Sequence, residues 1–298
     1  MRSHSLGRRG RWRWWAAAAA LLVVVLLGVA GCSMLGGEFA PEVATPEMAA
    51  QALQSRFVDD DDGAIHYVVA GREGTPLVLF VHGSPGTWEA WRGYLTDGEL
   101  SRKARLVALD RPGFGGTQRG RAEPSLVRQA AAVAAVARAE GGGPGIVVGH
   151  SLGGPIAAEL AAGAPELVSG LLLIAPSIDP TLEQLRWYNV AGSLVVVQWL
   201  LPRDLITSNR ELWPLRAELE RLTPRLAGIR APVVVIQGGK DSLVPPGNAD
   251  FAARAFSGTE VELQLLPEAT HFVVWQDPRL VVRAIVELLG RTGADPNG

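Results

Sequence analysis

The residues best suited to covalent chemistry stand in a short glycine-rich segment in the middle of the chain. Ser151 is the central residue of Gly149-His150-Ser151-Leu152-Gly153, a G-x-S-x-G pattern. An apolar stretch, 146–148, precedes the pattern and a helical pattern, 152–162, follows it. A tight turn between a strand and a helix holds such a serine in a strained backbone conformation and exposes its hydroxyl. Ser151 is therefore the predicted nucleophile, and the alternative is an ordinary glycine-rich turn.

A serine hydroxyl is a weak nucleophile at neutral pH, so it needs a base and an acid that orients the base. His271 follows the apolar stretch 261–265 and precedes the last helical pattern of the chain. Asp241 follows the apolar stretch 233–236, and Asp179 is the other position open to the acid. We predict that His271 is the base and Asp241 the acid.

Two backbone N–H groups beside Ser151 are predicted to stabilise a developing oxyanion. His82-Gly83-Ser84-Pro85-Gly86 follows the apolar stretch 77–81, and the Ser84 N–H is the candidate from this loop. The Leu152 N–H, directly after the nucleophile, is the other candidate. Removing one fixed donor of this kind raises a reaction barrier by about 3 kcal/mol. The alternative is a loop of glycine and proline that only turns the chain.

Neighbouring polar residues are predicted to have structural roles. His150 is adjacent to Ser151 in sequence, so its side chain is expected to point away, and His82 is expected to stabilise its own loop. Asp110, which begins the segment DRPGFG, is predicted to form a turn, and His66 is predicted to lie in a strand.

The composition argues against several other kinds of site. One cysteine and five scattered histidines, without an HExxH motif, give no metal site, and no cofactor is predicted. The run of four aspartates at 59–62 lacks the glutamate of an EF-hand loop and is predicted to be a solvated turn. Five of the 28 basic residues lie in the first 31 positions, so 23 remain against 30 acidic residues. This acidic balance argues against nucleic acid as a partner.

Apolar stretches alternate with helical patterns, and this order predicts how the reactive residues are brought together. Alternation of strand and helix predicts an α/β fold with a doubly wound, mostly parallel sheet and helices on both faces. Loops at the carboxyl ends of such strands carry the catalytic residues. The predicted strands are 65–69, 77–81, 105–109, 146–148, 171–174, 233–236 and 261–265, and the predicted helices are 88–95, 126–138, 152–162 and 280–289.

Five motifs in this order resemble the α/β-hydrolase superfamily. They are HGSPG, DRPGFGGT, GHSLGG, GGKDSLVP and a late histidine, and the resemblance covers the segment from about 63 to 290. The resemblance implies the α/β-hydrolase fold and a triad of nucleophile Ser151, base His271 and acid Asp241. HGSPG and DRPGFG are similar to a branch with epoxide hydrolases, haloalkane dehalogenases, C–C bond hydrolases and carboxylesterases. The first two use aspartate where this chain has Ser151, so the resemblance favours the other chemistries.

A segment of about 177–230 interrupts the alternation between two predicted strands. In the superfamily this position carries a small helical cap over the active site. Aromatic residues of this segment are expected to line an apolar pocket or to pack the cap onto the body: Trp187, Tyr188, Trp199 and Trp213.

Together these residues predict a serine hydrolase, specifically a carboxylesterase that cleaves small to medium apolar esters through an acyl-enzyme. Alternatives of the same fold are a C–C bond hydrolase, a thioesterase and an amidase. The alternative of another class is a non-catalytic binding lipoprotein that kept the fold. Labelling by a fluorophosphonate probe, which needs an activated serine, separates this last class from the others.

The first residues are predicted to be an export signal and not part of the fold. A cluster of four arginines at 8–13 precedes the apolar run 16–30, and small residues follow before Cys32. Val29-Ala30-Gly31-Cys32 resembles the lipobox of a bacterial lipoprotein. That resemblance implies cleavage before Cys32 and acylation of its thiol and of its new amino group.

The chain is accordingly divided into three parts. Residues 1–31 are the predicted signal peptide, 32–56 a tether and 57–298 the hydrolase domain. The protein is expected to be exported and lipid-anchored to a bacterial membrane, the outer membrane facing the periplasm in a host with two membranes. An uncleaved N-terminal anchor helix is the alternative.

Overall fold

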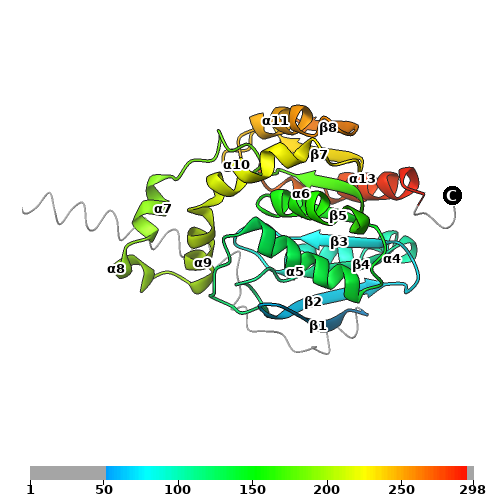
Figure 1. The fold of residues 1–298 in the computed structure, drawn as a ribbon, viewed down its shortest axis with the longest axis horizontal. Coiled ribbons are helices and arrows are strands. Elements are labelled where there is room, and N and C mark those ends of the chain that lie inside the picture. The colour runs from blue at the N-terminus through cyan, green and yellow to red at the C-terminus, as the bar shows by residue number, and fades with distance from the viewer. Residues whose placement is uncertain (1–51, 294–298) are drawn as a thin grey trace, which may run out of the picture. The chain divides into compact units, whose positions relative to one another are not determined.

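An eight-stranded sheet forms the centre of the computed structural model, which describes residues 52–293 (Figure 1). Its strand order is β1-β2-β4-β3-β5-β6-β7-β8. β1 and β2 pair antiparallel, as do β2 and β4, whereas every other neighbouring pair is parallel. The strands are β1 Gln54–Asp60, β2 Gly63–Gly71, β3 Leu77–Val81, β4 Arg105–Leu109, β5 Gly145–His150, β6 Val168–Ile174, β7 Val233–Gly238 and β8 Val261–Leu266.

The central strands are apolar along their whole length because helices cover both faces of the sheet. In β3, Leu79 and Val81 belong to one hydrophobic core, while Val78 and Phe80 belong to the core on the opposite face. Parallel sheets buried on both faces show such continuous apolar runs. The prediction of a mostly parallel, doubly wound α/β sheet is therefore confirmed.

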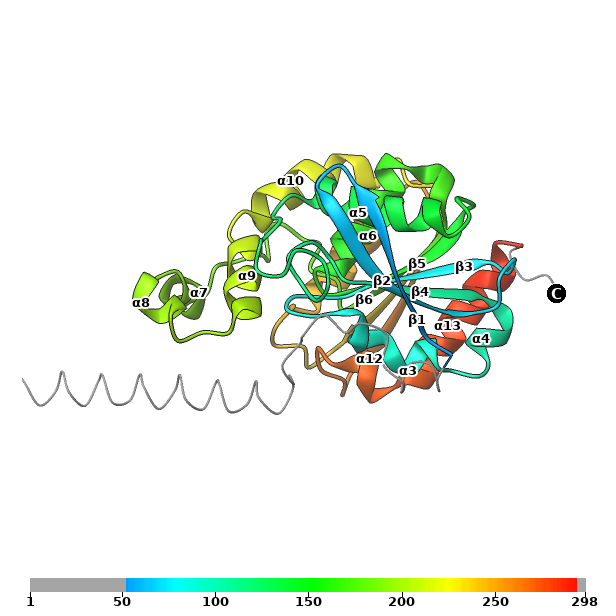
Figure 2. The same ribbon diagram turned by 90° about the horizontal axis from the view of Figure 1, so that it is seen from below.

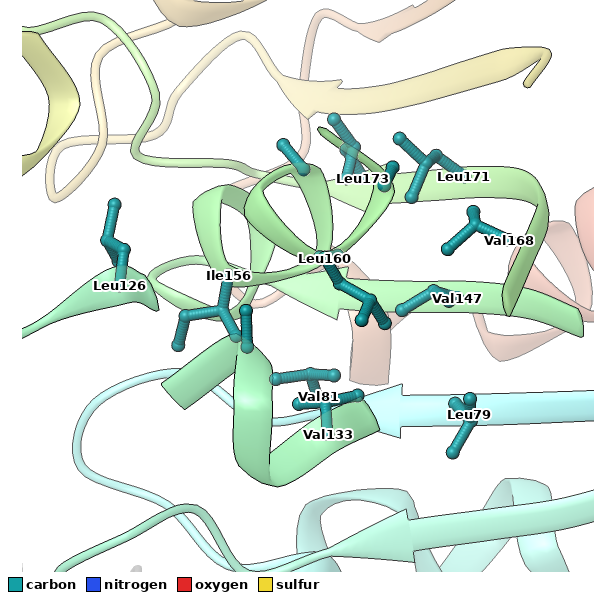
Figure 3. Packing of buried hydrophobic residues seen from close by; sticks show 14 of the residues in the cluster. Leu79, Val81, Leu126, Val133, Val147, Ile156, Leu160, Val168, Leu171 and Leu173 are labelled. Atoms are coloured by element: carbon teal, nitrogen blue, oxygen red, sulfur yellow. The ribbon is translucent and has the colours of Figure 1, made fainter. Parts of the chain in front are cut away.

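Two groups of helices cover the sheet. One face carries α5 Leu126–Ala139, α6 Gly153–Gly163, α10 Leu215–Leu226 and α11 Gly247–Ala255. Figure 3 shows this core, where Val133 of α5 and Ile156 and Leu160 of α6 pack against Val81 and Val147 of the sheet. The other face carries the 3₁₀ helix η1 Trp88–Trp91, α3 Arg92–Leu95, α4 Leu100–Lys103, α12 Val273–Gln276 and α13 Pro278–Arg291. A second 3₁₀ helix, η2 Pro165–Leu167, leads into β6.

The strand β1 differs from the sequence-based expectation. Residues 54–56, predicted as part of the tether, begin this strand, and it pairs with β2 along its whole length. Its side chains alternate between exposed and half-buried positions because it lies at the edge of the sheet. A mixed polar strand of this kind carries a weak apolar signal.

The predicted cap divides into two parts in the structure. The short helices α7 Trp187–Gly192, α8 Val195–Gln198 and α9 Arg203–Leu212 project from one end of the sheet (Figures 1 and 2). In contrast, α10 packs on the body, because Leu215, Leu219, Leu222 and Leu226 are buried in the same core as α6. The projecting insertion therefore ends at about residue 214, earlier than the predicted boundary near 230.

The predicted signal peptide, Cys32 and most of the predicted tether lie outside the described residues. Within residues 52–293, no helix has both the length and the apolar character needed to cross a bilayer.

Candidate active site

Ser151 stands in a sharp turn between β5 and α6. Its backbone has a φ of 54°, in the left-handed region that residues other than glycine rarely adopt. The Ser151 N–H donates to the Ile174 carbonyl of β6 at 2.9 Å, which fixes the turn to the sheet. The flanking glycines are required by packing. A Cβ on Gly149 would lie 2.3 Å from the Gly153 carbonyl oxygen, and a Cβ on Gly153 would lie 2.2 Å from the Val81 oxygen.

The structure brings His271 and Asp241 into direct contact. His271 Nδ1 lies 2.8 Å from Asp241 Oδ2. The second oxygen, Oδ1, accepts hydrogen bonds from the Leu243 and Val244 N–H groups at 2.9 and 2.8 Å. Burial opposes the charge on Asp241, but these bonds and the neighbouring imidazole lower its pKa overall. A carboxylate can only accept, so Nδ1 carries the proton and Nε2 of His271 is left as a proton acceptor.

The two predicted oxyanion donors belong to segments that lie next to Ser151. Leu152 caps α6, and the loop after β3 passes so close that a Cβ on Gly83 would lie 2.9 Å from Ser151 Cβ. Among the described residues, no protein acceptor receives a hydrogen bond from the Ser84 or Leu152 N–H. Both donors are thus free for a ligand, and both residues line the cavity that Ser151 lines.

This cavity has a volume of about 880 Å³ and lies between the body and the projecting insertion. His271 lines it together with Ser151. The insertion and neighbouring loops supply much of an apolar wall, which includes Leu182, Leu185, Leu201, Leu205, Leu212, Leu243 and Val244. Polar side chains such as Asn189, Ser208 and Asn248 also line it. Ligand pockets of enzymes have this size.

The aromatic residues of the insertion divide between one of the two expected roles and exposure to solvent. Trp187 and Tyr188 line the cavity, as one expectation has it. Trp199 and Trp213 do not line it: Trp199 is largely exposed to solvent, and Trp213 is partly exposed.

His150 supports the loop that carries His271. Its Nε2 donates to the His271 backbone oxygen at 3.1 Å, and the two rings lie 4.8 Å apart. Burial, together with the neighbouring His271, lowers the pKa of His150 to about 3. His150 is therefore neutral at neutral pH.

Other polar residues have the structural contacts expected of them. Asp110 accepts hydrogen bonds from the Trp88 and Gly116 N–H groups and pairs with His66 at 2.7 Å. His82 Nδ1 donates to the Gly83 carbonyl at 2.7 Å. These bonds hold the loops after β3 and β4.

Asp179, the alternative acid, bonds to other residues than the triad candidates. Its Oδ1 accepts hydrogen bonds from the Thr181 N–H and hydroxyl, at 2.8 and 2.7 Å. Nothing links it to His271, whose carboxylate partner is Asp241.

A buried ion pair next to the cavity was not indicated by the sequence. Arg111, after β4, forms two 3.0 Å hydrogen bonds to the carboxylate of Glu211 on α9, and both side chains are almost completely buried. Arg111 also donates to the carbonyls of His82 and Gly83 at 2.9 Å. The Ser84 hydroxyl donates to Glu211 as well. The pair therefore joins the insertion to the loop that carries one predicted oxyanion donor.

A second group missing from the sequence-based site is the carboxyl of Glu183. It lines the cavity and accepts a 2.6 Å hydrogen bond from the Ser177 hydroxyl. Burial raises its pKa, against the effects of Ser177 and of the nearby Arg186. Neither residue belongs to a motif, so the sequence offered no signal for this contact. Within residues 52–293, no group of histidine, cysteine and acidic side chains is arranged to hold a metal ion.

Comparison with known proteins places this site in a family. Residues 78–284 match the alpha/beta hydrolase family. The chain belongs to this family. The matched region includes Ser151, Asp241 and His271 together with the insertion.

Individual relatives of this hydrolase differ in their activities. The chain is 30% identical over 242 residues to the dihydrolipoyllysine-residue acetyltransferase component of the acetoin cleaving system of Cupriavidus necator. That match covers 70% of this chain and 63% of the relative, so less than two thirds of the relative is represented. Human monoacylglycerol lipase ABHD6 is 26% identical over 282 residues, which cover 80% of this chain and 82% of the lipase.

Solved structures share the fold of this hydrolase. A membrane phospholipase A described as a bacterial virulence factor aligns with a TM-score of 0.62 at 22% identity. The alignment covers 95% of this chain and 97% of the phospholipase. At this level of identity the likeness establishes the fold alone.

Proposed function

We propose that this hydrolase is a serine carboxylesterase acting on small to medium apolar esters, with Ser151, His271 and Asp241 as its triad. The observation that carries the proposal is the His271–Asp241 hydrogen bond, which leaves Nε2 of His271 as an acceptor in the cavity that Ser151 lines. The strained turn at Ser151 supports it, because such strain persists only where the surrounding structure enforces it.

In the first half of the reaction, Ser151 Oγ forms a bond to the ester carbonyl carbon while His271 Nε2 takes the hydroxyl proton. The carbonyl electron pair moves onto oxygen, where the Ser84 and Leu152 N–H groups stabilise the negative charge. The bond to the alcohol oxygen then breaks, and His271 gives its proton to the departing alcohol. Asp241 holds the imidazole in the required tautomer and stabilises its charged form.

The second half releases the acid. Water attacks the acyl-enzyme while His271 Nε2 takes its proton, and the same N–H groups stabilise the second tetrahedral intermediate. The bond to Ser151 Oγ breaks, and the serine regains its proton from His271. Both half-reactions consist of acyl transfer and proton transfer, and neither changes an oxidation state.

The substrate class is supported by the apolar residues that line the cavity and by the activity of a similar protein, a monoacylglycerol lipase. The C–C bond hydrolase, thioesterase and amidase chemistries share the triad, and no contact in the cavity favours them over ester hydrolysis.

Fluorophosphonate labelling followed by hydrolysis of a series of aryl esters with increasing acyl length tests the proposal. We expect the full-length protein to be labelled and to hydrolyse the esters, and Ser151→Ala to lose both. A protein that is not labelled, or a Ser151→Ala variant that retains turnover, would exclude the triad mechanism.

We further propose that Cys32 carries a lipid anchor that holds the exported enzyme at a bacterial membrane. The support is the sequence Val29-Ala30-Gly31-Cys32 after a basic and then apolar segment. Several acyl chains on one residue are enough for stable anchoring, whereas a single chain is not.

A further inference from the structure

The projecting insertion carries a large apolar surface that no residue of the described range 52–293 covers. Its members lie on α7, on α8 and beside them, and their side chains are exposed by between 52% and 83%. α8 has no buried residue at all. We call this surface the insertion patch and define it by Trp187, Val190, Leu194, Val195, Val196 and Trp199. Exposed apolar surfaces of this extent mark sites that bind a membrane or another protein.

The charges around the insertion patch favour an anionic partner. Arg203 and Arg210 lie on α9, next to the patch-bearing helices in sequence. The acidic residues that flank the patch in sequence are already bonded, since Asp204 pairs with Arg119 and Glu183 accepts from Ser177. Within the described residues, Arg203 and the nearby Arg210 form no ion pair. These two arginines are therefore cations available to an anionic partner, in a chain whose residues after position 31 carry more acidic than basic groups. Anionic phospholipid headgroups attract basic residues placed close to a membrane surface.

The composition of the insertion patch also favours a bilayer over a second copy of this chain as its partner. Short helices with tryptophan and aliphatic residues on one side and arginines at the margins are typical of segments that lie in a membrane interface. A two-fold dimer through the same patch would instead bring the arginines of both copies to one interface, where like charges repel.

The insertion patch is continuous with the entrance of the cavity. Trp187 belongs to both, since it lines the cavity and is 66% exposed. Tyr188 and Gly192, on the same helix α7, also line the cavity. A surface that rests on lipid at this point would place the cavity mouth against the apolar molecules of the bilayer.

We propose that the insertion patch docks on an anionic phospholipid bilayer and that the cavity receives its ester from that bilayer. The second clause rests on the proposed esterase function, whereas the docking does not. The proposal therefore assigns this chain a membrane-binding surface on its cap, separate from any anchor at its N-terminus.

Spin labels on the full chain test the docking directly. Val196→Cys places a nitroxide on the patch, and Glu287→Cys places one on α13, at the opposite end of the molecule (Figure 1). The unmodified chain, whose only cysteine is Cys32, gives the background signal. In vesicles of phosphatidylcholine and phosphatidylglycerol, we expect the label at 196 to be more accessible to oxygen than to a water-soluble nickel reagent. The label at 287 should show the reverse.

Equal accessibility of the two labels to the nickel reagent would overturn the docking. Dipolar broadening at position 196 without preference for oxygen would also overturn it, because a second copy would then cover the patch. Vesicles of phosphatidylcholine alone should weaken the oxygen preference, since they lack the anionic headgroups that the arginines bind.

Kinetics with two exposed valines test the delivery of substrate. Val196 is 63% exposed on the patch, and Val127 is 57% exposed on α5, so neither substitution disturbs the core. We expect Val196→Glu to lower kcat/KM about tenfold for an ester embedded in anionic vesicles, which corresponds to about 1.4 kcal/mol. A water-soluble ester should be hydrolysed at the parent rate, and Val127→Glu should leave both rates unchanged.

The two proposals fail in different ways. A parent protein that hydrolyses neither ester contradicts the esterase function, and the spin labels still decide the docking. Equal rates of the parent and Val196→Glu on the vesicle ester would contradict delivery from the bilayer while leaving the esterase intact.

Discussion

At the scale of single residues, the backbone of Ser151 stores strain that the side chain cannot relieve. Its φ of 54° suits glycine better than serine or alanine. We expect Ser151→Gly and Ser151→Ala to be equally inactive, but the glycine variant to have the larger free energy of unfolding, by about 1 kcal/mol. Equilibrium unfolding in urea measures this difference. Equal stabilities would mean that the turn relaxes when the hydroxyl is removed.

Asp241 is expected to act through His271 and not through the fold. Asp241→Asn keeps the shape of the side chain but removes the preference for the Nδ1–H tautomer. We expect kcat to fall about ten-thousand-fold with the fold retained, as circular dichroism would show. Asp179→Asn is the matched control and should leave kcat unchanged, because Asp179 bonds to Thr181 instead. The opposite pattern would reassign the acid.

Glu183 gives the stability a pH dependence of defined sign. Its raised pKa means that the folded state holds the proton more tightly than the unfolded state. This contribution to stability is present at acidic pH and is lost as the pH rises through the raised pKa. Glu183→Gln, which still accepts from Ser177, should therefore increase the free energy of unfolding at neutral pH, with little change below the ordinary glutamate range.

The measurement for Glu183 is urea unfolding of the variant and the parent across this pH interval. Exposed Glu287 offers the control, since Glu287→Gln should change the stability little at any pH. If Glu183→Gln raised the free energy of unfolding equally at acidic and neutral pH, the charge of Glu183 would not be the cause.

At the scale of elements, the Arg111–Glu211 pair fixes α9 to the loops of the body. Removing one partner leaves the other charge buried and unpaired, so Glu211→Ala should lower the free energy of unfolding by about 3–5 kcal/mol. Glu220→Ala on α10 breaks an exposed ion pair with Arg216 and should cost less than about 1 kcal/mol. Denaturant unfolding of the two variants tests this contrast.

The pair can also be removed as a whole. Arg111→Met combined with Glu211→Leu eliminates both charges and should recover much of the stability. We expect this double variant to have a lower kcat than the parent protein, because the carbonyls of His82 and Gly83 lose the guanidinium that holds their loop. Full recovery of kcat would limit the pair to a structural role.

These elements also show what the sequence could and could not predict. β3 and β5 were predictable because burial on both faces makes them continuously apolar. β1 was not, because an edge strand with one side in solvent keeps polar residues such as Asp59. α10 was placed in the cap, since its sequence does not reveal that its leucines pack on α6.

The candidate site shows the same division. Ser151, Asp241 and His271 follow predicted strands, so the topology alone brings them to one edge of the sheet. The contact of Arg111 with Glu211 joins residues 100 positions apart on a loop and on an inserted helix. The sequence around each residue gives no sign of this contact, because the contact depends on how the insertion folds back onto the body.

At the scale of the whole molecule, Cys32 is predicted to decide where the enzyme resides. We expect Cys32→Ser to abolish metabolic labelling by a palmitate analogue in a bacterial host, because the thiol that accepts the lipid is gone. Fluorophosphonate labelling of Ser151 should persist in the same variant, which shows that the hydrolase domain still folds. Unchanged lipid labelling would contradict the anchor.

The long sequence separation of the contacts around the site has a consequence for the order of events during synthesis and folding. The bond between Ser84 and Glu211 spans 127 positions, and that between His150 and His271 spans 121. Closing such long loops costs chain entropy that is recovered only when distant strands pair, so these contacts form late in folding. On the proposed mechanism, a ribosome must complete β8 and His271 before Ser151 gains its base. We therefore expect the growing chain to be inert as a hydrolase until synthesis has passed His271.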